Sequence, residues 1–165
     1  MKVLIAEDET LIRLDLRAIL ERHGFTVCAE ARNGLEAVEL ARSTQPDLAL
    51  LDIRMPGLDG IEAARRMYAE RPLPIVMLTA FRDGRAVERA VEAGVFGYLL
   101  KPFREDDLAP ALHAAVARHR ELLTARRRGS QPPRRIEVRL PSRDGHAWPL
   151  RIDRNGDGSL DIQGA

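Results

Sequence analysis

Five polar side chains end or follow short apolar runs of this 165-residue chain. Glu7 and Asp8 come directly after "KVLIA", and Asp52 ends "DLALLD". Thr79 follows "LPIVML", and Lys101 follows "FGYLL". Carboxylates without histidine or thiol neighbours favour a hard cation such as Mg²⁺, and a lysine with a hydroxyl can hold phosphoryl oxygens. The residue types therefore indicate phosphoryl chemistry with a carboxylate as the nucleophile.

The apolar runs predict five strands, and the amphipathic stretches between them predict helices. The expected strands are residues 2–6, 25–30, 47–52, 73–78 and 96–100. Near-continuous apolar strands are typical of a parallel sheet that is covered on both faces. Strands that alternate with helices predict right-handed crossovers. The expected fold class is therefore α/β, a doubly wound parallel sheet of five βα units.

The helix boundaries carry recognisable signals. Thr10 is expected to cap the first helix, and Gly24 is expected to end it. The apolar face of that helix is expected to hold Leu11, Leu14, Ile19 and Leu20. The second helix is expected to start at Asn33 and to end before Pro46. Two further helices are expected in "GLDGIEAARRMYAERP" and "DGRAVERAVEAG", and a last helix begins near Glu105 or Asp106.

The predicted topology places the five polar side chains together. Ligands of open parallel sheets bind beyond the carboxyl ends of the strands, where all five would lie. Singly, each has a plainer interpretation, such as a solvated strand-end acid, a helix cap or a surface lysine. Together they favour a site, because clustered carboxylates need a neutralising cation. Lys101 is also one of only two lysines among 26 basic residues.

Residues 1 to about 123 resemble the receiver domain of bacterial two-component response regulators. The motifs are "AEDE", "LLDIRMPGLDG", "LTA" and "GYLLKPF", in this order. The resemblance implies a strand order of 2-1-3-4-5 and a cis bond between Lys101 and Pro102. It also implies a phosphorelay switch that catalyses only its own phosphorylation and dephosphorylation, and is otherwise not an enzyme.

The resemblance implies a role for each acid of the site. Asp52 would be the phosphoacceptor. Asp8 and Asp52 would bind Mg²⁺ directly, together with the backbone carbonyl of Arg54, and Glu7 would hold the ion through water. Mn²⁺ is the alternative ion.

The remaining residues would form the switch. Thr79 and Lys101 would contact phosphoryl oxygens, and Tyr98 would act as the aromatic switch. The donor would be a sensor histidine kinase. The output would be a change in the face formed by the fourth helix, fifth strand and fifth helix, which would bind a partner or a second copy of the chain.

The chain changes character after residue 125. Residues 126–135 are basic and contain prolines, which predicts a linker. Residues 136–165 alternate with period two around "RIEVRL", "AWPLRID" and "SLDIQ", which predicts a β-hairpin or meander. Roughly 30 residues are too few for an independent core. This segment is expected to dock on residues 1–125, to pair with a second copy or to stay partly ordered.

The output of the chain has two interpretations. The receiver motifs also resemble those of antiterminator-type regulators, whose helical C-terminal module binds RNA. Residues 129–165 alternate like strands and contain Pro132, Pro133, Pro141 and Pro149, so an RNA-binding output is the less favoured alternative. Residues 124–165 carry a net charge of +4, against −3 for residues 1–123. The sequence contains no helix-turn-helix pattern, so DNA binding is not expected. A Mg²⁺ phosphatase on a related sheet is a further alternative. It would carry a second acid two residues after Asp52, where this chain has Arg54.

The location of the protein follows from composition. Cys28 is the single cysteine, which excludes a disulfide within the chain and fits a reducing compartment. The apolar runs are far shorter than the roughly 20 residues that cross a membrane. We therefore expect a cytoplasmic protein without a membrane partner.

Overall fold

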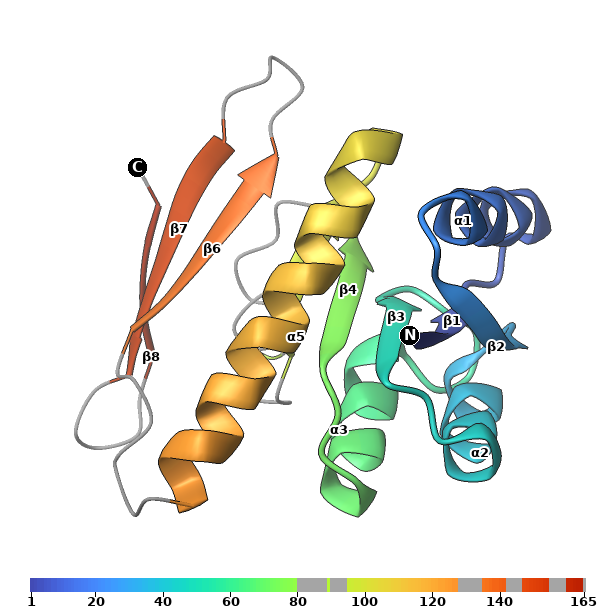
Figure 1. Ribbon diagram of the computed structural model, residues 1–165, viewed down its shortest axis with the longest axis horizontal. Coiled ribbons are helices and arrows are strands. Elements are labelled where there is room, and N and C mark those ends of the chain that lie inside the picture. The colour runs from blue at the N-terminus through green and yellow to red at the C-terminus, as the bar shows by residue number, and fades with distance from the viewer. Residues whose placement is uncertain (80–88, 90–94, 128–134, 142–146, 155–159, 165) are drawn as a thin grey trace.

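A five-stranded parallel sheet with helices on both faces forms the first part of the molecule (Figure 1). The computed structural model describes residues 1–79, 89, 95–127, 135–141, 147–154 and 160–164. The strands are β1 Lys2–Ala6, β2 Thr26–Ala31, β3 Leu48–Asp52, β4 Ile75–Thr79 and β5 Gly97–Leu100. Their order is β2-β1-β3-β4-β5, which confirms the predicted topology.

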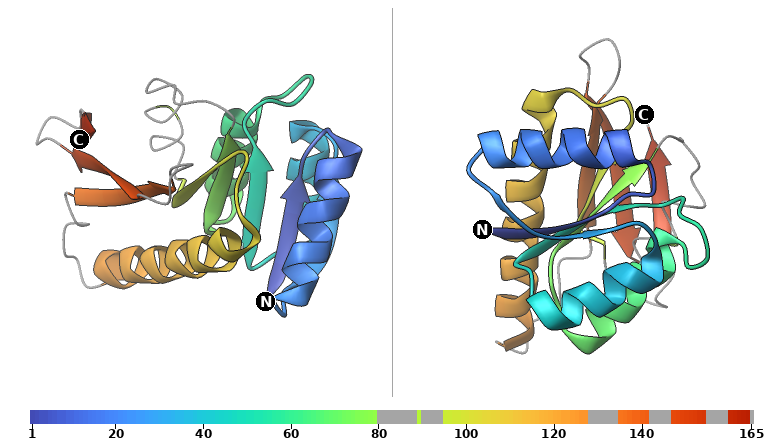
Figure 2. Two further views of the ribbon diagram at one scale, coloured as in Figure 1. Left: turned by 90° about the horizontal axis from the view of Figure 1, so that it is seen from above. Right: turned by 90° about the vertical axis from the view of Figure 1, so that its right-hand side faces the viewer.

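The helices divide between the two faces of the sheet. They are α1 Thr10–Arg22, α2 Gly34–Thr44, α3 Gly60–Glu70 and α5 Glu105–Arg127. The apolar residues of α1 and α5 pack in one core cluster, and those of α2 and α3 pack in another on the opposite face (Figure 2). The helix expected within residues 83–94 lies outside the described residues, apart from Arg89. Among the described helices, none is both long and apolar enough to span a membrane.

Local sequence signals set most of the observed helix ends. The Asn33 side chain accepts a hydrogen bond of 2.9 Å from the Glu36 backbone N–H and caps α2. Gly24 follows the end of α1 with φ of +79°, a conformation that glycine adopts without steric cost. The prediction for Thr10 was wrong by one position: Glu9 precedes the helix without a capping side-chain hydrogen bond, and Thr10 is already helical.

The buried face of α1 differs from the predicted one. Leu11 and Leu14 are 82% and 52% exposed, whereas Ile19 and Leu20 are buried as expected. Arg13 is buried on this helix as well. The buried stripe runs through positions 13, 16 and 20, so Arg13 is buried where hydrophobic periodicity predicted burial of the neighbouring Leu14.

In the described part of the C-terminal segment, three antiparallel strands form a second sheet. The strands are β6 Arg135–Pro141, β7 Ala147–Arg154 and β8 Leu160–Gly164, in that order. The register pairs Ile136 with Ile152 and Val138 with Leu150. Strand β6 approaches β5, the edge strand of the parallel sheet, without joining that sheet (Figure 2). The turns expected between these strands lie outside the described residues.

Candidate functional site

Three carboxylates converge beyond the carboxyl ends of β1 and β3. Glu7 and Asp8 follow β1, and Asp52 is the last residue of β3. One oxygen of each carboxylate lies within 4.8 Å of the others. Glu7 is fully buried and Asp52 is 7% exposed, whereas Asp8 is exposed. Neighbouring parallel strands β1 and β3 bring these acids together, as the sequence predicted.

Lys101 joins the carboxylate cluster from the end of β5. Its ammonium donates hydrogen bonds of 2.6 Å to Glu7 Oε2 and of 2.6 Å to Asp52 Oδ2. Its backbone N–H donates to the Thr79 carbonyl over 2.7 Å, which ties the end of β5 to the end of β4. Thr79 itself is buried. The Lys101–Pro102 peptide bond is cis, as the resemblance implied.

The charges of this cluster do not cancel. Burial raises the pKa of Glu7; the hydrogen bond from Lys101 opposes this shift, the charge of Asp52 adds to it, and the net result is a raised pKa. Burial lowers the pKa of Lys101, but its hydrogen bonds to Asp52 and Glu7 outweigh burial and raise it overall. The ammonium therefore stays charged. Three carboxylates against one ammonium leave two negative charges when all are ionised, which fits a divalent cation with a preference for oxygen ligands.

The segment after β3 shapes the Asp52 environment. The Arg54 backbone N–H donates to Asp52 Oδ1 over 3.3 Å. Gly60 begins α3, and its N–H donates to the Ile53 carbonyl over 3.0 Å. A Cβ atom at position 60 would lie 1.9 Å from the Asp52 carbonyl oxygen. Sequence reasoning missed Gly60, although the Asp-Gly pair after the "LLDIRMP" motif was a signal for a close backbone approach.

Tyr98 lies in β5, two strand positions before Leu100, which pairs with Thr79. Tyr98 is 3% exposed and packs in the same core cluster as the residues of α3. Burial raises the pKa of its phenol above the ordinary value, so the side chain stays neutral. The structure therefore places this aromatic side chain inside the fold, next to the strand that ends in Thr79.

A second missed residue is Arg13, which approaches the cluster from α1. Its guanidinium Nη1 donates to the backbone carbonyl of Glu7 over 2.7 Å. No periodicity rule could identify it, because Arg13 interrupts the apolar stripe of its helix.

The chain belongs to the response regulator receiver domain family, whose family model matches residues 3–113. It is 47% identical over 138 residues to the transcriptional regulatory protein PdtaR of Mycobacterium tuberculosis. The aligned residues make up 84% of this chain and 67% of that protein. It is also 40% identical over 116 residues to the transcriptional regulatory protein CseB of Streptomyces coelicolor. These aligned residues make up 70% of this chain and 49% of that protein. The chain therefore spans about half to two thirds of the length of these relatives.

Solved structures show the same fold. The signal receiver domain of a modulated diguanylate cyclase from Desulfovibrio desulfuricans is 40% identical, with a TM-score of 0.68 over 72% of this chain and 95% of that one. A LuxR-family two-component response regulator from Aurantimonas is 32% identical, with a TM-score of 0.67 over 70% of this chain and 84% of that one. The protein is thus a response regulator with a receiver domain, as its motifs implied.

Proposed function

We propose that the protein accepts a phosphoryl group on Asp52 from a sensor histidine kinase and acts as the switch of a two-component phosphorelay. The observation that carries this proposal is the placement of the Lys101 ammonium 2.6 Å from both Glu7 and Asp52, beside the exposed carboxylate of Asp8. In-line phosphoryl transfer requires a positioned nucleophile and cationic groups that neutralise charge on the transferring oxygens.

The proposed reaction forms one bond and breaks another. An oxygen of the Asp52 carboxylate attacks the phosphorus atom, and the bond from phosphorus to the histidine nitrogen of the kinase breaks, with its electron pair going to the nitrogen. The product is an acyl phosphate on Asp52. Lys101 is already hydrogen-bonded to Asp52 and can pair with a phosphoryl oxygen after transfer, and the Thr79 hydroxyl would bind a second one.

The proposed metal ligands are Asp8, Asp52 and the Arg54 carbonyl, with Glu7 acting through water. When bound, Mg²⁺ would neutralise charge on the transferring oxygens, and Mn²⁺ could replace it. The carboxylate cluster supports this assignment, because its ligand atoms are all oxygens and its net charge is negative.

The proposed output is a change on the face that contains β5 and α5. Movement of Thr79 toward the phosphoryl group would leave space into which the buried ring of Tyr98 can settle, which shifts the population between two conformations. We propose that residues 1–125 form the receiver, that 126–135 connect it to the tail, and that 136–165 form a sheet that responds to this face. The approach of β6 to β5 supports this arrangement.

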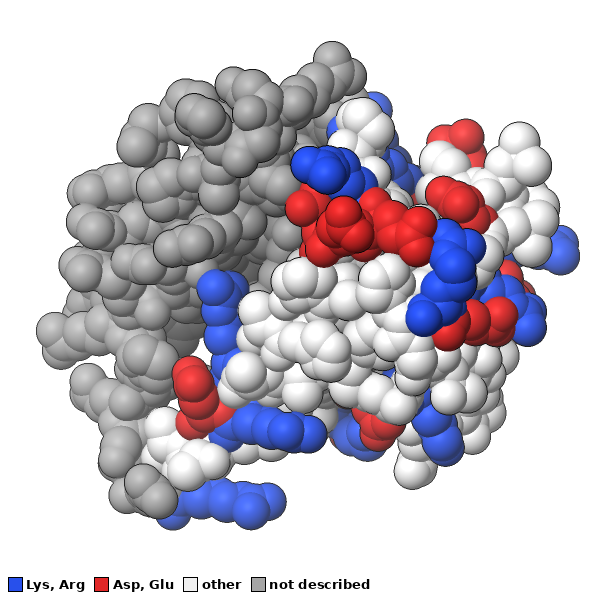
Figure 3. All heavy atoms as spheres, turned by 45° about the horizontal axis from the view of Figure 1, so that its top comes forward, with Lys and Arg blue, Asp and Glu red and all other residues white. Residues whose placement is uncertain are grey.

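Self-association is the output that we favour over RNA binding. The backbone register pairs Ile136 with Ile152, Val138 with Leu150 and Leu140 with Trp148. These apolar pairs alternate with other pairs along the two strands, and this pattern is typical of a sheet with one apolar face that needs a cover. On the side of the receiver drawn in colour in Figure 3, acidic side chains lie next to basic ones. This mixture differs from the continuous basic surface typical of nucleic-acid binding.

The reaction is tested by intact mass spectrometry after incubation with acetyl phosphate and Mg²⁺. We expect the mass to increase by one phosphoryl group, and Asp52→Asn to abolish the gain. Asp106→Asn is the matched control, since Asp106 is an exposed acid at the start of α5, and it should accept the group normally. Uptake by Asp52→Asn at the wild-type level would contradict the proposal.

A separate measurement tests the alternative output. RNA hairpins should bind weakly and without preference for the phosphorylated form. Tight binding that falls steeply with salt would instead favour an antiterminator.

A further inference from the structure

Arg13 is a charged residue on the buried face of α1. It is 6% exposed, and it shares that face with Leu16 and Leu20, which are 1% and 0% exposed. Burial of a guanidinium is costly unless its charge is paired and its N–H groups find acceptors. An apolar residue at this position would avoid that cost, so the contacts of Arg13 indicate what the charge supplies.

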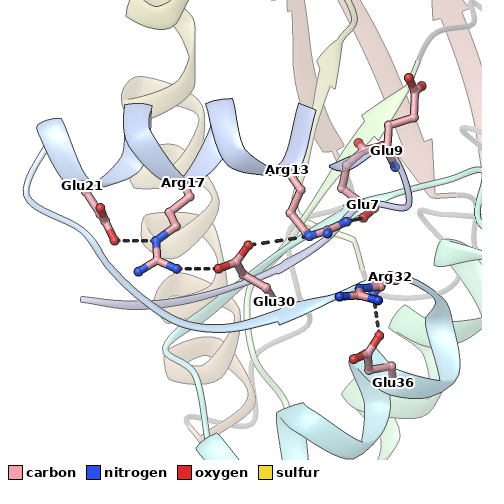
Figure 4. Close-up of polar contacts among 8 residues, drawn as sticks. All are labelled: Glu7, Glu9, Arg13, Arg17, Glu21, Glu30, Arg32 and Glu36. Carbon is pink, nitrogen blue, oxygen red and sulfur yellow. Dashed lines mark hydrogen bonds and ion pairs between the residues drawn. The ribbon is translucent and has the colours of Figure 1, made fainter. Parts of the chain in front are cut away.

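Arg13 ends a chain of polar contacts that runs from the surface of α1 to the site (Figure 4). Its Nη1 donates to the Glu7 carbonyl over 2.7 Å, and its Nε lies 3.6 Å from Glu30 Oε2 on β2. The other oxygen of Glu30 accepts a hydrogen bond of 2.7 Å from Arg17 Nη1. Arg17 in turn donates to Glu21 over 2.9 Å. Glu30 is thus held between two arginines, and it orients the buried one.

The carbonyl that Arg13 binds belongs to the peptide group that links Glu7 to Asp8. The N–H on the other side of Glu7 donates to the Ala31 carbonyl of β2 over 3.1 Å. The backbone of Glu7 is therefore held on both sides. Peptide groups are planar, so the orientation of this one sets the directions in which the Glu7 and Asp8 side chains leave the backbone.

We propose that Arg13 is a positioning residue of the metal site: by holding the Glu7–Asp8 peptide plane, it aims both carboxylates at the position where the cation binds. Glu30 supports Arg13, and Arg17 supports Glu30. The inference rests on the proposed function, because that function supplies the cation. The proposed ligands come from the ends of β1 and β3, and the inference adds residues of α1 and β2 that support them. Residues that orient metal ligands in this way influence metal affinity.

The test is calorimetric titration of the full chain with MgCl₂. We expect Arg13→Met to raise the Mg²⁺ Kd by at least about tenfold, as loss of a supporting contact typically does. Arg13→Lys keeps a cationic donor and should recover most of that affinity. Glu30→Gln should show a smaller loss. Arg66→Met, which removes an exposed arginine that pairs with Glu62 on α3, is the matched control and should bind Mg²⁺ like the wild type.

A second readout needs no metal. In the metal-free protein, Arg13→Met should speed hydrogen exchange at the Glu7 backbone N–H, which donates to the Ala31 carbonyl, because the Glu7 backbone would lose the hydrogen bond that Arg13 donates to its carbonyl. If Arg13 only stabilised the fold, Arg13→Met would lower the Tm. The Mg²⁺ Kd of the folded protein and the hydrogen exchange at this backbone N–H would then remain as in the wild type.

The outcomes separate this inference from the proposed function. A wild-type chain that neither binds Mg²⁺ nor gains a phosphoryl group overturns the proposed function and this inference with it. A wild-type chain that binds Mg²⁺, with an unchanged Kd in Arg13→Met, overturns only the role of Arg13. If Arg13→Met does not fold, Glu30→Gln decides, and a wild-type Mg²⁺ Kd in Glu30→Gln overturns the role of Arg13.

Discussion

Lys101 holds two carboxylates of the site together. It contributes one positive charge between Glu7 and Asp52, both of which are largely or fully buried. The same ammonium opposes the binding of a second cation by Coulomb repulsion and can pair with a phosphoryl oxygen.

Replacement of Lys101 by Met should separate metal binding from phosphoryl uptake. The metal-free protein should lose about 3 kcal/mol of unfolding free energy, because the buried carboxylates lose their partner. Its Mg²⁺ Kd should fall several-fold, since the site becomes more negative, whereas uptake from acetyl phosphate should slow by at least about tenfold. Calorimetry and mass spectrometry measure the two effects. Lys2→Met, which changes the other lysine, is the control, and a weaker Mg²⁺ affinity in Lys101→Met would contradict the charge argument.

Glu7 should make the stability of the metal-free protein depend on pH. Its pKa is raised in the folded state, so the folded protein binds this proton more tightly than the unfolded chain does. Stability should therefore fall as pH rises from the ordinary pKa of about 4.5 through the raised value.

Glu7→Gln should remove this part of the pH dependence and should reduce the stabilisation by Mg²⁺. Thermal unfolding across that pH range, with and without Mg²⁺, measures both effects. Glu9→Gln changes the exposed neighbour and should retain the wild-type profile. An identical profile in Glu7→Gln and the wild type would mean that Glu7 does not titrate in this range.

At the scale of elements, the junction of β3 and α3 positions the phosphoacceptor. Asp59 caps α3 by accepting a hydrogen bond of 2.7 Å from the Glu62 backbone N–H. Gly60 lets the first turn of α3 lie directly against the Asp52 carbonyl. The helix start and the strand end are therefore in contact through backbone atoms, and any added side chain would move one of them.

Gly60→Ala should destabilise the protein by about 3 kcal/mol, because the new methyl group overlaps the Asp52 carbonyl and forces the backbone to shift. It should also slow phosphoryl uptake. Chemical denaturation and mass spectrometry measure these effects. Gly57→Ala is the control: this position has φ of +75° but no atom within 4 Å of an added Cβ, so it should cost only about 1 kcal/mol and leave uptake unchanged. Equal effects from both variants would argue against a positional role for Gly60.

At the scale of the whole molecule, a receiver and a small second sheet share one chain. The tail sheet is a single layer of three strands in the described part of the chain, and a single layer cannot cover its own faces. Apolar pairs alternate along the register of β6 and β7, and β6 approaches β5. The tail therefore lies next to the part of the receiver that the switch is proposed to change.

Deletion of residues 129–165 should leave phosphoryl uptake intact, because every residue of the site precedes α5. The truncation should lower the Tm or change the oligomer size, because the surface that the tail contacts would become exposed to solvent. Calorimetry, and size-exclusion chromatography with and without acetyl phosphate, measure these effects. Unchanged stability and size in the truncated protein would contradict a docked or self-associating tail.

Sequence by itself determined the strands, their order through the receiver resemblance, and the site acids. Apolar runs predicted strands within about two residues of their observed bounds, and parallel strands bring their carboxyl ends to one edge. Asn33 and Gly24 marked helix ends because caps depend on local conformation. The three carboxylates, Thr79 and Lys101 were likewise predictable, since each of them ends or directly follows a predicted strand.

Only the tertiary structure decided which side chains contact one another. Lys101 and Glu7 lie 94 positions apart, and their hydrogen bond depends on packing that no local pattern encodes. Leu14 was predicted to be buried and Arg13 was not, because periodicity identifies an apolar face but not the polar acceptor that the buried face meets. The Glu7 carbonyl is that acceptor. The supporting contacts of the site were therefore visible only once α1, β1 and β2 were placed together.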